Sequence, residues 1–226
     1  MRPSLSSQRL STKDLVYFEI KQKIIEGLLK PNQSINEESL ASELDISRTP
    51  IREALQRLEM QELVIRLPNG RLKVAPISIQ EVEELFNVRS LLEGLVTREA
   101  TIQATDKDME KLKQYTQLIV DASEADQRVD VVNFGSEFHN YLYQISRNQT
   151  ATKILNQLND RVSRYRRLAP TKDNKRSQQA AEEHKKLFEA IANRNHDQAE
   201  KLMREHIHNS LNAAKSSIAL HLHNNE

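Results

Sequence analysis

One short stretch of this chain departs from helical periodicity, and it limits the folds that the chain can adopt. After residue 62 the period changes, and residues 63–67 and 71–75 have the composition of two short strands. Asn69-Gly70 lies between them. Asn-Gly between such runs is a strong short-range signal of a β-hairpin, because the tightest hairpin turns need the positive φ values that these two residues adopt readily. The sequence therefore predicts one hairpin.

Three helices are expected before this hairpin. The first helix is expected within residues 14–29, and Gly27 followed by Lys30-Pro31-Asn32 closes this segment. Its apolar residues lie near helical spacing: Leu15, Phe18, Ile24, Ile25 and Leu28. Asn36, followed directly by acidic residues, is typical of the start of a short second helix. A third helix begins just after it, with Ser47 or Thr49 as its N-cap.

This order of elements predicts a mainly α protein with two domains. A helix pair joined by a tight turn and followed by a two-stranded β wing is a winged helix-turn-helix, which we assign to residues 12–76. Residues 77–226 show only helical patterns, with about six helices and short connections, which favours an antiparallel bundle. Residues 1–11 are small and polar and are expected to form a flexible N-terminal arm.

Composition excludes several classes of protein. The net charge is only +1, from 33 basic and 32 acidic residues, so any DNA contact must come from local clustering and from pairing of two copies. The chain has no cysteine, which excludes disulfides and thiolate metal ligands and fits a cytoplasmic protein. It has no run of about 18 apolar residues, so we expect no membrane span.

Two arginines stand four residues apart at the start of the third helix, in the stretch SRTPIREAL. This end of a helix carries a positive partial charge, so cations are unfavourable there unless an anion lies against it. Arg48 and Arg52 project from one face, where a recognition helix meets the DNA major groove. Each can bind O6 and N7 of guanine. The alternative is a solvated surface on which Glu53 or Gln56 pairs with Arg52.

Other candidate DNA contacts surround these two arginines. Thr49 has a hydroxyl that can reach a phosphate. Basic side chains on the hairpin suit the DNA backbone or the adjacent minor groove. The expected DNA-binding set is Ser47, Arg48, Thr49, Arg52, Arg66, Gly70, Arg71 and Lys73.

The stretch SELDISRTPIREALQRLEMQELVIRLPNGRLKV resembles the DNA-binding domain of GntR-type transcription regulators. Four later stretches resemble the ligand-sensing FCD domain of the FadR branch of that family: NVRSLLEG, EFHNYL, EEHKKLFEAI and MREHIHNSL. Together the two resemblances cover nearly the whole chain. Many members carry an arginine in the helix before the recognition helix, where this chain has Glu38. The resemblance therefore leaves DNA contact to Arg48, Arg52 and the wing.

Three histidines fall on the inward faces of three different helices by their spacing. They are His139, His184 and His206. A single inward histidine is usually a core residue with one hydrogen-bond partner. If three converge, a divalent metal would satisfy all of them as neutral ligands and avoid the cost of buried nitrogens without partners. The spacing leaves both interpretations open, whereas the resemblance implies the metal, because these histidines match the FCD ligands one by one.

The FCD pattern usually has an aspartate one turn before the first histidine, where this chain has Gly135. The expected carboxylate ligand is therefore missing. A site of three histidines keeps more coordination positions open for water or for the carboxylate of a bound molecule. We expect Zn, with Ni or Mn as alternatives.

An organic acid is the expected effector. Arg89 interrupts the apolar stripe of its helix, so its guanidinium is expected to point into the bundle, where it needs an anion. Either Glu93, four residues on, or the carboxylate of a small acid can supply that charge. The resemblance favours the acid, and Arg161 and Arg164 can add further positive charge.

These observations predict a ligand-responsive, homodimeric DNA-binding regulator, a repressor in the first instance, that binds a short palindromic operator. Its helical domain would dimerise and sense a small carboxylate at the metal site, shifting DNA affinity. The competing hypothesis is a metal-dependent, hydrolase-like enzyme with an open water position at the three histidines. No inward acid near the histidines stands out as a general base, so we predict that the protein is not an enzyme.

Overall fold

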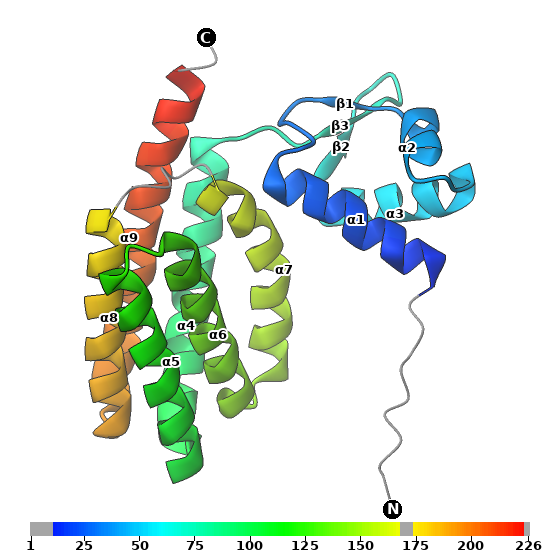
Figure 1. The fold of residues 1–226 in the computed structure, drawn as a ribbon. Helices are drawn as coiled ribbons and strands as arrows, with labels where there is room; N and C mark the ends of the chain where they lie inside the picture. Colours follow the sequence, from blue (N-terminus) through cyan, green and yellow to red (C-terminus); the bar gives the residue numbers. More distant parts are fainter. Residues whose placement is uncertain (1–10, 168–173, 224–226) are drawn as a thin grey trace, which may run out of the picture. The chain divides into compact units, whose positions relative to one another are not determined.

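The computed structural model describes residues 11–167 and 174–223, and these residues divide into two compact units between Ile77 and Ser78. Of the expected N-terminal arm, residues 1–10 lie outside the described part. Within it, the first unit has three helices and three short strands, and the second has six helices (Figure 1). The mainly α fold expected from the sequence is confirmed.

Capping signals in the sequence mark the end of the first helix and the start of the second, whereas the first helix begins at Thr12, two residues before the expected start. Helix α1 (Thr12–Glu26) ends at Gly27, which adopts φ 71° and donates its backbone N–H to the carbonyl of Ile24. Helix α2 (Glu37–Glu43) begins after Asn36, whose side chain accepts hydrogen bonds from two backbone N–H groups of the first turn. Helix α3 (Arg48–Met60) begins after Ser47.

The wing is a hairpin with one additional strand. Strands β2 (Val64–Arg66) and β3 (Leu72–Val74) pair antiparallel on either side of Gly70, which adopts φ 79°. Strand β1 (Ser34–Ile35) pairs with the other edge of β3, so the order is β1-β3-β2. The expected hairpin is confirmed. The third strand has only two residues, too few for a periodic signal, and it forms because the edge of β3 offers unpaired backbone groups.

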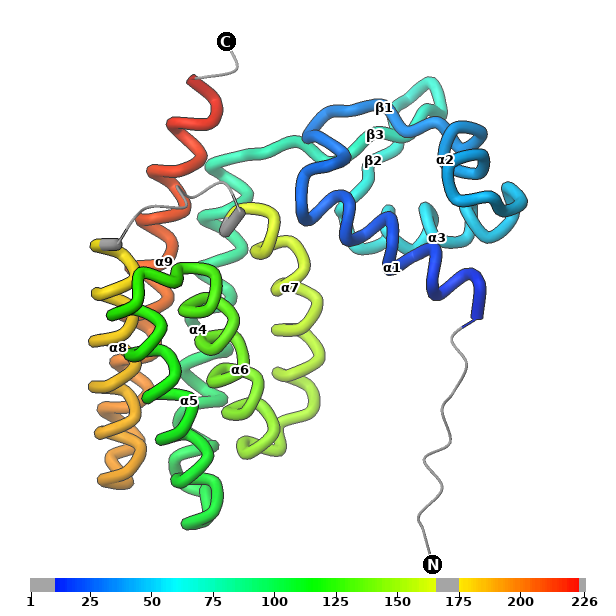
Figure 2. Tube along the Cα trace, in the orientation of Figure 1, coloured from blue at the N-terminus to red at the C-terminus, as the bar shows by residue number. Residues whose placement is uncertain are grey.

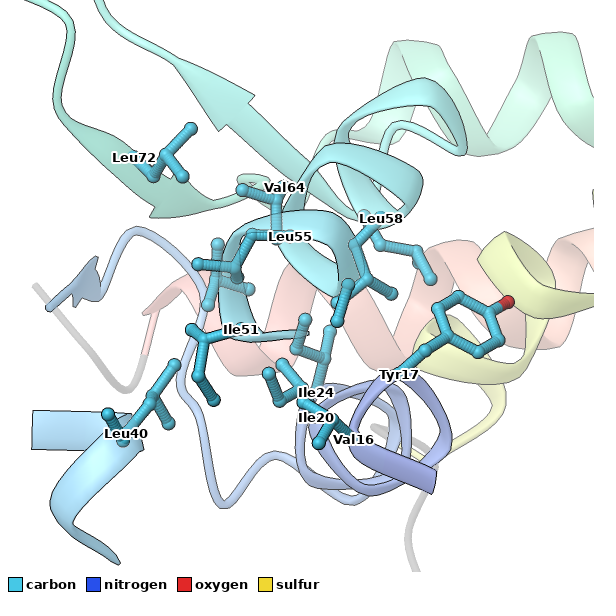
Figure 3. Close-up of a cluster of buried hydrophobic side chains, with 14 residues drawn as sticks. Val16, Tyr17, Ile20, Ile24, Leu40, Ile51, Leu55, Leu58, Val64 and Leu72 are labelled. Carbon is cyan, nitrogen blue, oxygen red and sulfur yellow. The ribbon is translucent and has the colours of Figure 1, made fainter. Parts of the chain in front are cut away.

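The core of the first unit lies between the three helices and the hairpin (Figure 3). Four residues of α1 are buried in this core: Val16, Tyr17, Ile20 and Ile24. By contrast Leu15, Phe18 and Leu28 are exposed. The apolar stripe expected for this helix was therefore largely wrong, because α1 carries apolar side chains on several sides and its spacing does not select one face.

The second unit is an antiparallel bundle in which α4 is the central element (Figure 2). Helix α4 packs along α9 and also contacts α6 and α7. Ion pairs near the two ends show that α4 and α9 run antiparallel, since Lys215 meets Glu83 and Arg98 meets Asp197. The helices are α4 (Ile79–Gln103), α5 (Asp106–Glu124), α6 (Arg128–Ser146), α7 (Gln149–Arg167), α8 (Asn174–Ala192) and α9 (His196–His223).

The helices of the two units do not include a candidate membrane span: among residues 11–167 and 174–223, no helix is both long enough and apolar enough to cross a bilayer.

Candidate functional site

The two arginines at the start of α3 are exposed and are held by the acidic first turn of α2. The side chains of Arg48 and Arg52 are 49% and 60% exposed. Arg52 donates from Nε to Glu37 at 2.7 Å, and Arg48 donates to Glu38 at 2.9 Å and to Glu37 at 3.4 Å. These hydrogen bonds hold the pKa of Glu37 below its usual value, despite partial burial. Intramolecular carboxylates thus occupy the place that the sequence left for an anion.

The remaining candidate DNA contacts lie on the same unit. Ser47 precedes α3 and makes no side-chain cap hydrogen bond, and Thr49 is exposed in the first turn. On the wing, Arg66 donates to Glu59 at 2.7 Å, and Lys73 donates to Asn32 at 3.0 Å. Gly70 and Arg71 are exposed at the hairpin turn. A substituted side chain at Gly70 would be strained by the positive φ, although no other atom would crowd it.

The three histidines converge inside the second unit. His139 on α6, His184 on α8 and His206 on α9 are each 7% exposed or less. One ring nitrogen of each lies within 4.8 Å of the others. Nε2 of His139 and Nε2 of His206 are 3.3 Å apart. The convergence that helical spacing alone left open is therefore present.

Each histidine is oriented by an oxygen at its other ring nitrogen. Nδ1 of His139 is 2.9 Å from Glu93, Nδ1 of His206 is 2.7 Å from Glu183, and Nδ1 of His184 is 2.7 Å from the carbonyl of Ala180. A carbonyl or an ionised carboxylate accepts but does not donate, so each Nδ1 must carry the proton. In the neutral rings, every Nε2 then presents a lone pair. Acceptors on the outer nitrogens are the usual environment of histidines that bind a metal.

Among the described residues, Nε2 of His184 is buried without a hydrogen-bond partner. Nε2 of His139 and Nε2 of His206 lie 3.3 Å apart, so two acceptors face each other there when both rings are neutral. Protonation is disfavoured at two of the rings. Burial lowers the pKa of His206 to about 4, and burial together with His206 lowers the pKa of His184 well below its usual value. One cation at the centre would satisfy all three nitrogens, whereas one proton would not.

Glu93 connects this centre to the buried arginine. Its carboxylate lies 2.8 Å from Arg89 and accepts a hydrogen bond from the hydroxyl of Tyr143 at 2.7 Å, in addition to its contact with His139. Burial would raise the pKa of Glu93, but His139 and Arg89 hold it below its usual range. The sequence left two anions open for Arg89, the side chain of Glu93 and the carboxylate of a small acid. The structure shows Glu93, four residues along the same helix.

The histidines line a cavity of about 130 Å³ whose walls are largely apolar. None of the three arginines expected to bind an effector belongs to its lining. Arg89 contacts Glu93, Arg161 binds Glu81 at 2.7 Å, and Arg164 is buried. The cationic side chains that do line the cavity are Arg128 and Arg176, each in the first turn of its helix.

Sequence reasoning missed these two arginines and also Glu183, which orients His206. Arg176 binds Glu183 at 3.1 Å and the hydroxyl of Ser210 at 3.1 Å. Arg176 and Glu183 lie seven residues apart on one face of α8, whereas Arg128 lies on α6. Nothing in the local sequence shows that Arg128 lines the same cavity as Arg176. Helical spacing was a signal for Glu93, four residues after Arg89, and for Glu183, seven residues after Arg176.

Gly135 lies one turn before His139 and lines the same cavity. A β carbon at this position would lie 3.6 Å from Cε1 and Nε2 of His184, which is ordinary van der Waals contact. A side chain at residue 135 would therefore point toward the ring nitrogens. The glycine leaves that side of the centre open.

Two family models match the chain. The FCD domain matches residues 84–209, and the model described as bacterial regulatory proteins, gntR family, matches residues 12–74. The first match alone spans more than half of the chain. The chain is a GntR-family transcription regulator with an FCD domain. Its two matched regions coincide with the winged unit and the helical bundle.

Curated relatives of this GntR-family regulator are named as regulators rather than enzymes. The HTH-type regulator YdhC of Bacillus subtilis is 27% identical over 84% of this chain and 85% of its own. The Nta operon transcriptional regulator of Aminobacter aminovorans is 28% identical over 79% and 82%. The repressor RspR of Escherichia coli is 26% identical over 85% and 84%. The hydrolase hypothesis therefore has no support from the relatives.

Solved structures show the same fold at lower identity. McbR/YncC of E. coli superposes with a TM-score of 0.76 at 20% identity, covering 91% of this chain and 97% of that one. A GntR-type regulator from Rhodococcus sp. RHA1 gives 0.72 at 17% identity, covering 91% and 98%.

Proposed function

We propose that this GntR-family regulator is a homodimeric repressor whose affinity for a specific operator changes when a small carboxylate binds beside a divalent metal ion in the FCD domain. The observation that carries the proposal is the convergence of three histidines, each with its Nδ1 bound to an oxygen acceptor. A core packed for stability alone has no reason to aim three buried lone pairs at one point.

His139, His184 and His206 would hold the ion. Neutral imidazole nitrogens suit Zn, Ni and other late transition metals, and Zn is our first choice, with Ni or Mn as alternatives. When bound, the ion would supply open coordination positions, because the protein offers three ligands and residue 135 has no side chain. Glu93 and Glu183 would keep the rings oriented and basic.

The cavity beside the histidines fits a small acid with an aliphatic part. Its apolar wall includes Phe86 and Val131, and its cationic groups are Arg128 and Arg176. A carboxylate placed toward the histidines and an aliphatic part against the apolar wall would match this distribution. Arg89 and Arg161 would then act from outside the cavity lining, because each balances a carboxylate, Glu93 and Glu81 respectively, while Arg164 is buried outside that lining.

Helix α4 offers a surface for the homodimer. Val88, Leu91, Leu95 and Ile102 share one face of this helix at helical spacing, and they are 47%, 56%, 38% and 60% exposed. Such a run on the outside of a bundle matches a self-complementary helix contact. Pairing through α4 would join two winged units, so that each contacts one half of a palindrome. Since the target is DNA, we place the protein in the cytoplasm.

Calorimetric titration of Zn, Ni and Mn into chelator-treated protein tests the metal centre. We expect one ion per chain, and replacement of His139, His184 or His206 by alanine should lower the affinity by about 100-fold or more. His208→Ala is the matched control, because this histidine is exposed on the same helix as His206. Equal affinities in the control and in the three variants would refute the site.

A thermal-shift screen of small carboxylates with and without metal tests the effector. An acid that binds at the centre should raise the melting temperature of the metal-loaded protein and lose this effect when a chelator is added. It should also change the affinity for operator DNA. An acid whose stabilisation survives chelation would bind elsewhere.

A further inference from the structure

Glu37 contacts both arginines at the start of α3, but it holds them differently. It accepts from Nε of Arg52 at 2.7 Å and from a terminal nitrogen of Arg48 at 3.4 Å. The other terminal nitrogen of Arg48 donates to Glu38 at 2.9 Å. Arg48 is therefore held by its terminal nitrogens, whereas Arg52 is held by the nitrogen nearest its aliphatic chain.

This difference decides what each arginine can offer to DNA. Within the described residues, the two terminal nitrogens of Arg52 make no hydrogen bond, and its side chain is 60% exposed. An arginine binds O6 and N7 of guanine with two parallel N–H donors. A carboxylate on Nε restrains the guanidinium plane and leaves the terminal pair for such a contact. Before Arg48 can offer two donors to a base, its terminal nitrogens must lose their hydrogen bonds to Glu38 and Glu37.

Glu37 is better placed than Glu38 to restrain a partner. The side chain of Glu37 is 28% exposed and that of Glu38 is 72% exposed, although both lie in the first turn of α2. Asn36 caps that turn and fixes its backbone. The positive end of α2 also favours an ionised carboxylate at this position. Glu37 is thus a fixed anion, whereas Glu38 is a solvated one.

We propose that Glu37 is a positioning residue that sets Arg52 for guanine and so determines the sequence preference of the recognition helix, while Glu38 affects DNA affinity through its charge alone. The inference rests on the proposed sequence-specific DNA binding. It adds a role for an acidic residue that itself makes no contact with the bases.

The test begins with the native full-length protein and a random pool of DNA duplexes, from which bound sequences are selected. Arg52→Ala identifies the base pair at which the preference for guanine depends on Arg52. Glu37→Asp then keeps the charge but shortens the side chain by one methylene. We expect this variant to lose roughly fivefold or more of the preference for guanine at that base pair, with unchanged affinity for random DNA.

Glu38→Asp is the matched control and should change neither quantity. The neutral variants Glu37→Gln and Glu38→Gln should both bind random DNA more tightly, because each loses one negative charge near the phosphates. Only the change at Glu37 should also weaken the guanine preference. In an Arg52→Ala background, Glu37→Asp should have no further effect on it. Circular dichroism melts confirm that each variant is folded.

The outcomes separate the inference from the function on which it rests. A native protein that selects no sequence from the pool refutes sequence-specific binding and the inference with it. A native protein that selects a sequence, with Glu37→Asp and Glu38→Asp both unchanged in guanine preference, refutes the positioning role alone. Equal losses of preference in Glu37→Gln and Glu38→Gln would also refute it, since charge would then explain the effect.

Discussion

Each unit of the protein contains an arginine–glutamate pair at a similar distance in opposite surroundings. Arg52 and Glu37 meet at 2.7 Å on the surface of the winged unit, whereas Arg89 and Glu93 meet at 2.8 Å in the bundle with side chains 2% and 0% exposed. In water, an ion pair contributes little to the free energy of unfolding. In the interior, breaking a pair leaves an uncompensated charge. The first pair therefore contributes little to stability and is available for a role in DNA binding, while the second is part of the scaffold.

The largest expected effect comes from removing one carboxylate from each pair. Glu93→Ala leaves the guanidinium of Arg89 buried without its anion, so the free energy of unfolding of the bundle should fall by about 3–5 kcal/mol. Glu37→Ala should lower the stability of the winged unit by less than about 1 kcal/mol. Urea denaturation of the chelator-treated variants, followed by circular dichroism, measures both. Similar losses in the two variants would remove the distinction between the pairs.

An intermediate effect is expected on DNA binding rather than on folding. Arg52→Ala should weaken operator binding by about 1–3 kcal/mol, the contribution of one bidentate contact to a base. The unfolding free energy should stay within about 0.5 kcal/mol of the native value, as for other exposed substitutions. Fluorescence anisotropy with labelled operator and a parallel urea titration measure the two quantities. A variant that binds DNA normally but unfolds easily would assign Arg52 to the structure instead.

The smallest expected effect is on stability, and it concerns two tyrosine hydroxyl groups that donate to carboxylates, one of them buried and the other partly exposed. Tyr143 donates to Glu93 inside the bundle, and Tyr141 donates to Asp108 nearer the surface, both at 2.7 Å. Tyr143→Phe should cost about 1–2 kcal/mol of stability, because Glu93 loses a donor in the dry interior. Tyr141→Phe should cost about 0.5 kcal/mol, because water can replace the hydroxyl. Thermal melts that rank them in the reverse order would contradict this view.

Local signals in the sequence predicted the elements that local interactions determine. The Asn69-Gly70 turn and the Asn36 cap could both be predicted, because each depends only on the conformation and hydrogen bonds of the neighbouring backbone. The convergence of the three histidines could be predicted only as one of two alternatives, because helical spacing places each histidine on an inward face but does not show that they meet. These are the features that one chain segment specifies by itself.

Features that depend on a distant partner were not predictable in this way. The buried face of α1 depends on which side α3 covers, and several sides of α1 are apolar. The partner of Arg161 is Glu81, eighty residues away, and the arginines of the cavity come from the starts of two separate helices. Helical periodicity says that a side chain faces inward, and it does not say what lies opposite.

Glu93 and Glu183 orient two of the histidines, and each is already balanced by an arginine, Arg89 and Arg176 respectively. The negative charges of these two carboxylates are thus already balanced without a metal ion. A divalent cation would bring two positive charges into an interior that holds no spare negative charge among these groups, and uncompensated charge in such a medium is costly. If the proposed ion binds, its counterion would have to come from outside this group of residues, and an anionic guest would then be retained more strongly than a neutral one of the same shape.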